Sequence, residues 1–187
     1  MKILKNHPTV LLAVPFLLLT VAASAIASDA PRVPRTTLAA AEKSLDNRFA
    51  GLWSDNPFIM LGPTRGVYLE GYGAVFTAEV NLVMNPVSLM SSRLSKEDIA
   101  KVRQKKLDRL PLLKKALRES MVSMAASLDT VPGEEQIAIV AFIDHYPWED
   151  VTGVPVQVTL TAQKKKLVEA QRAGGAGLDA AIRVTEN

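Results

Sequence analysis

A strict alternation of apolar and polar residues between positions 72 and 84 constrains the fold more than any other feature of this sequence. The apolar residues of one parity are Tyr72, Ala74, Phe76, Ala78, Val80, Leu82 and Met84. The other parity carries Thr77, Glu79 and Asn81. Successive side chains of a strand point to opposite faces, so this pattern predicts a strand with one buried face and one solvated face.

A shorter strand, Val67–Leu69, is expected before this one. The two are joined through Gly71, Tyr72 and Gly73. Glycine tolerates both a tight hairpin turn and a bulge within one long strand. The sequence therefore leaves both arrangements open.

A long amphipathic helix is expected after residue 95. Ser95 is the predicted N-cap, and Glu97 and Asp98 place acidic groups in the first turn. Apolar residues then recur at helical spacing as far as Leu128. Pro111 lacks a backbone donor and clashes with the preceding turn, so a kink or two abutting helices are expected there.

The remaining elements complete an α+β order. The run 137–143 is apolar on both parities and predicts a central strand covered on both faces. Residues 154–162 alternate and predict a strand with one solvated face, residues 163–172 favour a helix, and residues 182–184 are a candidate for a short last strand. Thr36 or Thr37 is expected to cap an earlier helix from Leu38 to about Phe49. The fold class is α+β, an antiparallel sheet with helices on one face, and the order matches the β-α-β-β-α-β core of ferredoxin-like folds preceded by a helix and a hairpin.

The N-terminus has the pattern of a secretory signal. Lys2 and Lys5 precede an apolar run, and Ala25-Ile26-Ala27 supplies the small residues of a cleavage site after Ala27. We therefore expect a signal peptide over 1–27, a flexible lead-in over 28–37 and a single domain over 38–187. The expected location is periplasmic or extracellular, without a transmembrane anchor after cleavage. Loss of the two lysines lowers the net charge from +3 to +1.

Residues 55–173 resemble an uncharacterised family of exported bacterial proteins. The residues that carry the resemblance are the string from Leu61 to Leu82 (LGPTRGVYLEGYGAVFTAEVNL), Arg109–Leu113 (RLPLL) and Trp148–Asp150 (WED). The family has no assigned reaction, ligand or catalytic residue. The resemblance implies an exported single domain and adds no site.

The densest polar cluster follows the apolar run at 137–143. It consists of Asp144, His145, Glu149 and Asp150, and His145 is the only histidine beyond the predicted signal peptide. These residues could form a carboxylate-rich metal site or a base with its orienting acid, or they could be ordinary loop residues. The chain lacks cysteine, and HExxH, GxSxG and P-loop motifs are missing. No metal or cofactor is predicted.

The first part of the long helix is strongly basic. Residues 96–118 hold nine lysines and arginines against three acidic residues. Lys101, Lys105 and Arg109 follow one another at four-residue spacing on an expected outer face, and Lys115 extends this set. Arg103 and Lys106 project into the apolar stripe, where their stems are expected to snorkel. The face is either simply solvated or a surface for an anionic partner.

Two functions are compatible with these observations. The preferred hypothesis is a non-enzymatic module of the cell envelope that binds an anionic envelope component or an acidic protein through the basic helix or an exposed sheet face. An exported protein is not expected to bind nucleic acid. The alternative is a small hydrolase-like enzyme centred on His145. The sequence does not determine the oligomeric state.

Overall fold

The structure is a computed structural model and describes residues 33–52, 59–84 and 94–187. In chain order its helices and strands are α1 (Arg35–Ala50), β1 (Ile59–Met60), β2 (Arg65–Leu69), β3 (Gly73–Asn81), α2 (Lys96–Ser127), β4 (Gln136–Ile143), β5 (Gln157–Gln163), α3 (Lys164–Arg172), α4 (Leu178–Ala181) and β6 (Arg183–Glu186). The predicted strands at 67–69, 72–84, 137–143, 154–162 and 182–184 correspond to β2 to β6, with shifted ends.

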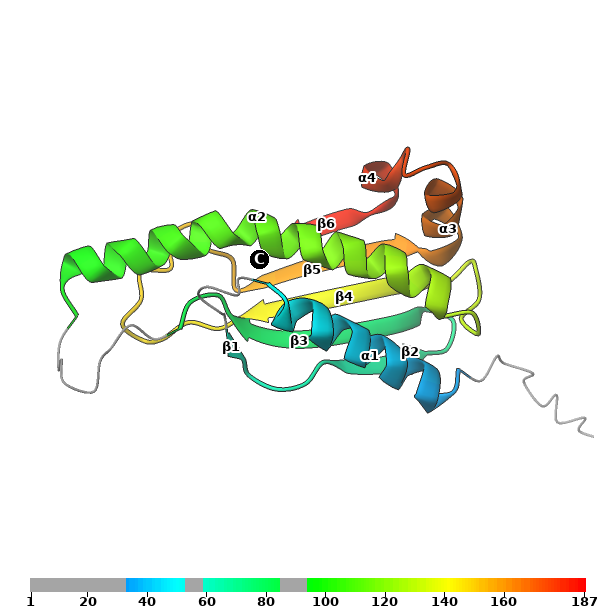
Figure 1. The fold of residues 1–187 in the computed structure, drawn as a ribbon, viewed down its shortest axis with the longest axis horizontal. Helices are drawn as coiled ribbons and strands as arrows, with labels where there is room; N and C mark the ends of the chain where they lie inside the picture. Colours follow the sequence, from blue (N-terminus) through cyan, green and yellow to red (C-terminus); the bar gives the residue numbers. More distant parts are fainter. Residues whose placement is uncertain (1–32, 53–58, 85–93) are drawn as a thin grey trace, which may run out of the picture.

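The strands form one six-stranded sheet of mixed direction (Figure 1). The order is β1-β3-β4-β5-β6, and β2 pairs with β3 on the same side as β1. β3 and β4 are parallel neighbours, whereas the other pairs are antiparallel. The expectation of an antiparallel sheet is therefore corrected. The predicted ferredoxin-like strand order is wrong too. In that fold another strand lies between the two strands that the first helix of the β-α-β unit connects, whereas here β3 and β4, which α2 connects, are direct neighbours. Here β1 and β2 occupy the other edge of β3, and β6 pairs with β5.

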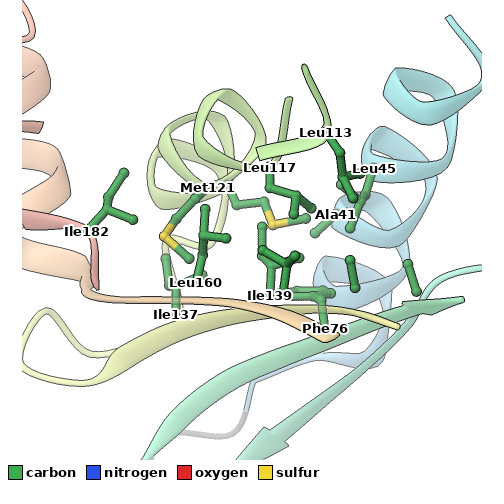
Figure 2. Close-up of a cluster of buried hydrophobic side chains, with 14 of the residues drawn as sticks. Ala41, Leu45, Phe76, Leu113, Leu117, Met121, Ile137, Ile139, Leu160 and Ile182 are labelled. Carbon is green, nitrogen blue, oxygen red and sulfur yellow. The ribbon is translucent and has the colours of Figure 1, made fainter. Parts of the chain in front are cut away.

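Helices cover one face of this sheet, which confirms the α+β class (Figure 1). Figure 2 shows Leu113, Leu117 and Met121 of α2 packed above Ile137 and Ile139 of β4. The prediction that β4 is covered on both faces is wrong, because Phe142 on its other face is 41% exposed. Apolar runs on both parities of β4 reflect its central position in the sheet rather than two covering layers.

A hairpin turn joins β2 to β3, which settles the alternative left open above. Leu69 pairs with Gly73, and the amide of Tyr72 donates to the carbonyl of Leu69 at 3.0 Å. Tyr72 is in the turn and 41% exposed, not on the buried face of the strand. Gly73 has φ +129°, and a Cβ there would lie 1.9 Å from the carbonyl oxygen of Gln136. Glycine is required at this position because two backbones approach closely.

Helix α1 is fixed to β2 by two carboxylates. Glu42 accepts a hydrogen bond from the amide of Gly66 at 2.6 Å, and Asp46 accepts one from the amide of Thr64 at 2.9 Å. Arg35 donates to both oxygens of Glu42, at 2.7 and 2.8 Å. The hydrogen bond and charge of Arg35 hold the pKa of Glu42 below its ordinary value. This network ties the first helix to the sheet.

Helix α2 begins with the predicted cap. Ser95 and Asp98 form a reciprocal capping box. One continuous helix runs through Pro111, so two abutting helices are excluded. Pro111 is exposed, where water can satisfy the carbonyl that lacks its donor.

The segment that follows α2 is held by Lys164, the first residue of α3. Its ammonium group donates to the carbonyls of Leu128 and Val131, both at 2.6 Å.

The predicted start of the domain is shifted. Helix α1 begins at Arg35 with Pro34 as its N-cap, so the predicted caps at Thr36 and Thr37 and a flexible segment extending to residue 37 are wrong. The predicted signal peptide at 1–27 lies outside the described residues. None of the described helices combines the length and apolar character that crossing a membrane requires.

Candidate functional site

The loop after β4 folds back toward helix α2. Its first residue is fixed to the sheet, because the amide of Asp144 donates to the carbonyl of Val80 at 2.8 Å. The amide of Tyr146 then donates to Oε1 of Glu149 at 3.2 Å. The rings of Tyr146 and Trp148 stack with their centroids 5.5 Å apart. This tight loop directs the Glu149 carboxylate inward.

Glu149 forms a buried ion pair with Lys106 of α2. The two side chains are 2% and 1% exposed, and Nζ of Lys106 contacts Oε2 of Glu149 directly. Nζ also donates to the carbonyl of Asp144 at 2.8 Å. Burial lowers the pKa of Lys106, and the adjacent Glu149 carboxylate opposes that shift. The ion pair joins the loop to the middle of the long helix.

His145 contacts both members of this pair through one nitrogen. Its Nδ1 is 3.2 Å from Nζ of Lys106 and 3.3 Å from Oε2 of Glu149. Nδ1 can accept from the ammonium in one tautomer or donate to the carboxylate in the other, but not both at once. Nε2 is buried and has no hydrogen-bond partner. The ring thus fills the space beside the ion pair, and its side chain is only 11% exposed.

Asp144 and Asp150 are placed differently. The Asp144 carboxylate accepts from Nδ2 of Asn81 at 3.4 Å, so it points to the end of β3. The Asp150 carboxylate accepts from the amide of Thr152 at 3.0 Å and pairs with Arg103 at 3.3 Å. The hydrogen bonds from Thr152, followed by that from Arg103, lower the pKa of Asp150. Of the four predicted residues, the structure brings only His145 and Glu149 into side-chain contact.

The predicted basic face is partly wrong. Arg109 is only 6% exposed and donates to the carbonyl of Leu82 at the end of β3. Each step of four residues advances 40° beyond a full helical turn, so the row from Lys101 through Lys105 reaches the buried side at Arg109. Lys101 is 67% exposed and pairs with Glu97 at 2.9 Å. Lys105 is half-buried, and Lys115 is exposed.

Sequence reasoning missed the role of Lys106. Its position in the apolar stripe of α2 suggested a snorkelling stem, which is wrong because its ammonium group is buried against Glu149. The signal was a lysine at a core position of one helix and a carboxylate in a loop that follows a buried strand. No local pattern joins two such residues, which are 43 positions apart in the sequence.

The arrangement is that of a buried structural network. A general base needs a nitrogen or oxygen that can reach a substrate, whereas Nδ1 of His145 contacts two buried charged groups. Three surface depressions, of about 310, 390 and 670 Å³, lie elsewhere on α1, α2, α3 and α4. Within the described residues, no group of three or more histidine and acidic side chains could hold a metal ion.

Comparison with known proteins identifies no relative of this chain. No family model, curated protein or solved structure matches this chain.

Proposed function

We propose that this protein is an exported, non-enzymatic binding module of the cell envelope that contacts an anionic surface through Lys101, Lys105 and Lys115 of α2. We call these three residues the lysine face. The observation that carries the proposal is the concentration of basic residues on this helix, nine against three acidic ones over residues 96–118, in a chain with a net charge of only +3. Such segregation of charge attracts anionic partners.

The geometry supports the lysine face as the part of α2 available to a partner. Lys106 and Arg109 are buried. Arg103 and Lys114 pair with Asp150 and Glu186 of other segments. On a 3.6-residue wheel the three lysines lie within about 80° of one another. Lys101 and Lys115 are exposed, and Lys105 is half-buried.

The contacts of the lysine face are weak enough to be exchanged for a partner. Lys101 pairs with Glu97, but both side chains are largely exposed, at 67% and 77%. Pairs of this kind contribute about 0.5 kcal/mol or less. An anionic surface can therefore compete for Lys101 at little cost. The expected partner chemistry is a dense array of phosphate, sulfate or carboxylate groups.

The alternative of a hydrolase-like enzyme centred on His145 receives less support. Its Nδ1 lies against both Lys106 and Glu149, and its Nε2 is buried. Asp150, which the enzyme hypothesis would place beside it, pairs with Arg103 instead.

The test is binding by a triple variant, Lys101→Gln with Lys105→Gln and Lys115→Gln. Cosedimentation with vesicles rich in acidic lipid, and retention on heparin, report the two sources of anionic groups separately. We expect the wild type to bind at low salt and to be released as salt rises, because screening shortens the reach of exposed charges. The triple variant should lose binding.

A matched control removes the same charge elsewhere. Lys43 of α1 and Lys166 and Arg172 of α3 are exposed, and their replacement by Gln should leave binding nearly unchanged. Equal loss in both triple variants would show dependence on net charge alone. That result, or a wild type that binds neither surface at low salt, would overturn the proposal.

A further inference from the structure

A depression lies between the end of α1 and the middle of α2, and Lys115 of the lysine face lines it. The two helices pack against each other over the same face of the sheet (Figure 1). The volume of the depression is about 310 Å³, at the lower end of the range of ligand sites, about 300–1,000 Å³. The lining side chains that bear on its chemistry are Arg48, Leu52, Leu112, Lys115, Ala116 and Glu119.

The apolar part of this lining is open to water at Leu112, which is 47% exposed. On a 3.6-residue wheel Leu112 falls within the arc of the lysine face, about 20° from Lys105 and about 60° from Lys115. Leu52, just after α1, is half-buried and contributes a second apolar side chain. A purely ionic partner gains nothing from these leucines, whereas a hydrocarbon group gains free energy by removing them from water.

Two cations accompany this apolar surface. Lys115 forms no ion pair within the described residues. Arg48 pairs with Glu119 at 2.8 Å, and the two side chains are 37% and 47% exposed. Ion pairs as exposed as this one are weak, so an anionic ligand can displace the Glu119 carboxylate from Arg48.

We propose that this depression binds an amphipathic anion, a hydrocarbon group that carries one phosphate or carboxylate. The anionic group contacts Lys115 and Arg48, and the hydrocarbon covers Leu112 and Leu52. In naming the partner chemistry of the lysine face, the inference rests on the proposed function. Membrane lipids and free alkyl phosphates or fatty acids share this chemistry, whereas a sulfated or carboxylated polysaccharide lacks the hydrocarbon.

NMR titration of the isotope-labelled protein tests the site. The probes are inorganic phosphate, butyl phosphate and octyl phosphate, each below its micelle concentration. We expect affinity to rise with chain length, by up to about fourfold for each buried CH₂ group. The shifted amide signals should be concentrated at residues 48–52 and 112–119. Octyl phosphate that binds no more tightly than inorganic phosphate, or shifts centred on other residues, would overturn the proposal.

A matched pair of variants tests the apolar contact. Leu112→Ser should weaken octyl phosphate binding about fivefold, because about half of the leucine side chain is available to be covered. Val151→Ser removes an apolar side chain of similar exposure, 46%, from the loop after β4 and should leave the affinity unchanged. Equal affinities of wild type and Leu112→Ser would contradict the proposed contact.

The charges are tested in the same titration. Lys115→Gln should weaken octyl phosphate binding, whereas Lys43→Gln, at an exposed lysine of α1 that does not line the depression, should not. Glu119→Gln should strengthen binding, because it leaves Arg48 without a competing carboxylate. Weaker binding by Glu119→Gln would refute the assigned role of Arg48.

Heparin and vesicles separate this inference from the proposed function. Leu112→Ser should keep the wild-type retention on heparin, which offers no hydrocarbon. A wild type that is retained on heparin but does not prefer octyl phosphate would overturn the amphiphile site alone. A wild type that binds octyl phosphate but neither heparin nor vesicles would overturn the proposed function alone. Cosedimentation with acidic vesicles that weakens in Leu112→Ser assigns the site to a membrane lipid, and unchanged cosedimentation assigns it to a free amphiphile.

Discussion

The buried pair of Lys106 and Glu149 gives the most direct quantitative prediction. Lys106→Met removes the ammonium group and retains a chain of similar length. Glu149 would then be a buried carboxylate without its cation, since its side chain is only 2% exposed. It would keep the amide of Tyr146 at 3.2 Å and the ring of His145 at 3.3 Å. The variant therefore measures the cost of an uncompensated charge that retains some of its hydrogen bonds.

The expected cost follows from these remaining contacts. Removal of one partner of a buried ion pair typically destabilises a protein by about 3–5 kcal/mol. Since two hydrogen-bond donors remain near Glu149, we expect a value near the lower limit, about 3 kcal/mol. For a chain of this size the melting temperature should fall by about 6–12 °C.

Urea denaturation of the single and double variants provides the assay. Glu149→Gln alone should cost a similar amount, because it leaves Lys106 charged with the carbonyl of Asp144 at 2.8 Å. The double variant should be destabilised by clearly less than the sum of the two single variants, since neither charge then remains buried. Additive effects within about 0.5 kcal/mol would refute the claim that the two charges compensate each other.

Two further predictions concern the other end of the fold. Glu42→Gln should lower the urea midpoint at neutral pH, because Arg35 depresses the pKa of Glu42 and the charged carboxylate therefore stabilises the fold. This contribution is fully present above the ordinary carboxyl pKa of 4.5. It is lost as the pH falls through the lower pKa that Glu42 has in the folded state. Midpoints measured from pH 7 to pH 3 should therefore converge for wild type and variant, and a constant difference would contradict this linkage. Gly73→Ala should cost about 3 kcal/mol in the same assay, because its Cβ would lie 1.9 Å from the carbonyl oxygen of Gln136. Gly71→Ala, where nothing lies within 4 Å, should cost only about 1 kcal/mol from its φ of +78°, and equal losses would contradict the steric argument.

The sequence predicted those features that depend on local pattern. Alternation identified β3 and β5, and the Ser95–Asp98 spacing identified the start of α2. Strand order is a different kind of property. Nothing in the sequence of β3, α2 and β4 indicated that β2 would pair with the outer edge of β3. Nor did it indicate that β3 and β4 would be direct neighbours in the sheet.

The candidate site was predictable only in part, for a similar reason. The loop residues His145 and Glu149 were identified from their density of polar groups, and they do contact each other. Their third member, Lys106, is distant in sequence, and its position in the apolar stripe of α2 predicted a snorkelling stem rather than a buried ammonium group. Arg109 was misplaced because four-residue spacing follows a row that winds around a helix rather than one that stays on its outer side.

The two carboxylates that join α1 to β2 also bear on polymerisation. Glu42 and Asp46 are four residues apart, about 6 Å along a helix, which nearly matches the distance of about 6.8 Å between alternate amides of an extended chain. They accept hydrogen bonds from Gly66 and Thr64, amides that an added strand would otherwise use. A fibre built by strand addition needs a receptive edge on both sides of every copy. With these charged acceptors already bound along β2, chains that joined through the opposite edge at β6 would lack a second receptive edge at β2 from which a fibre could grow.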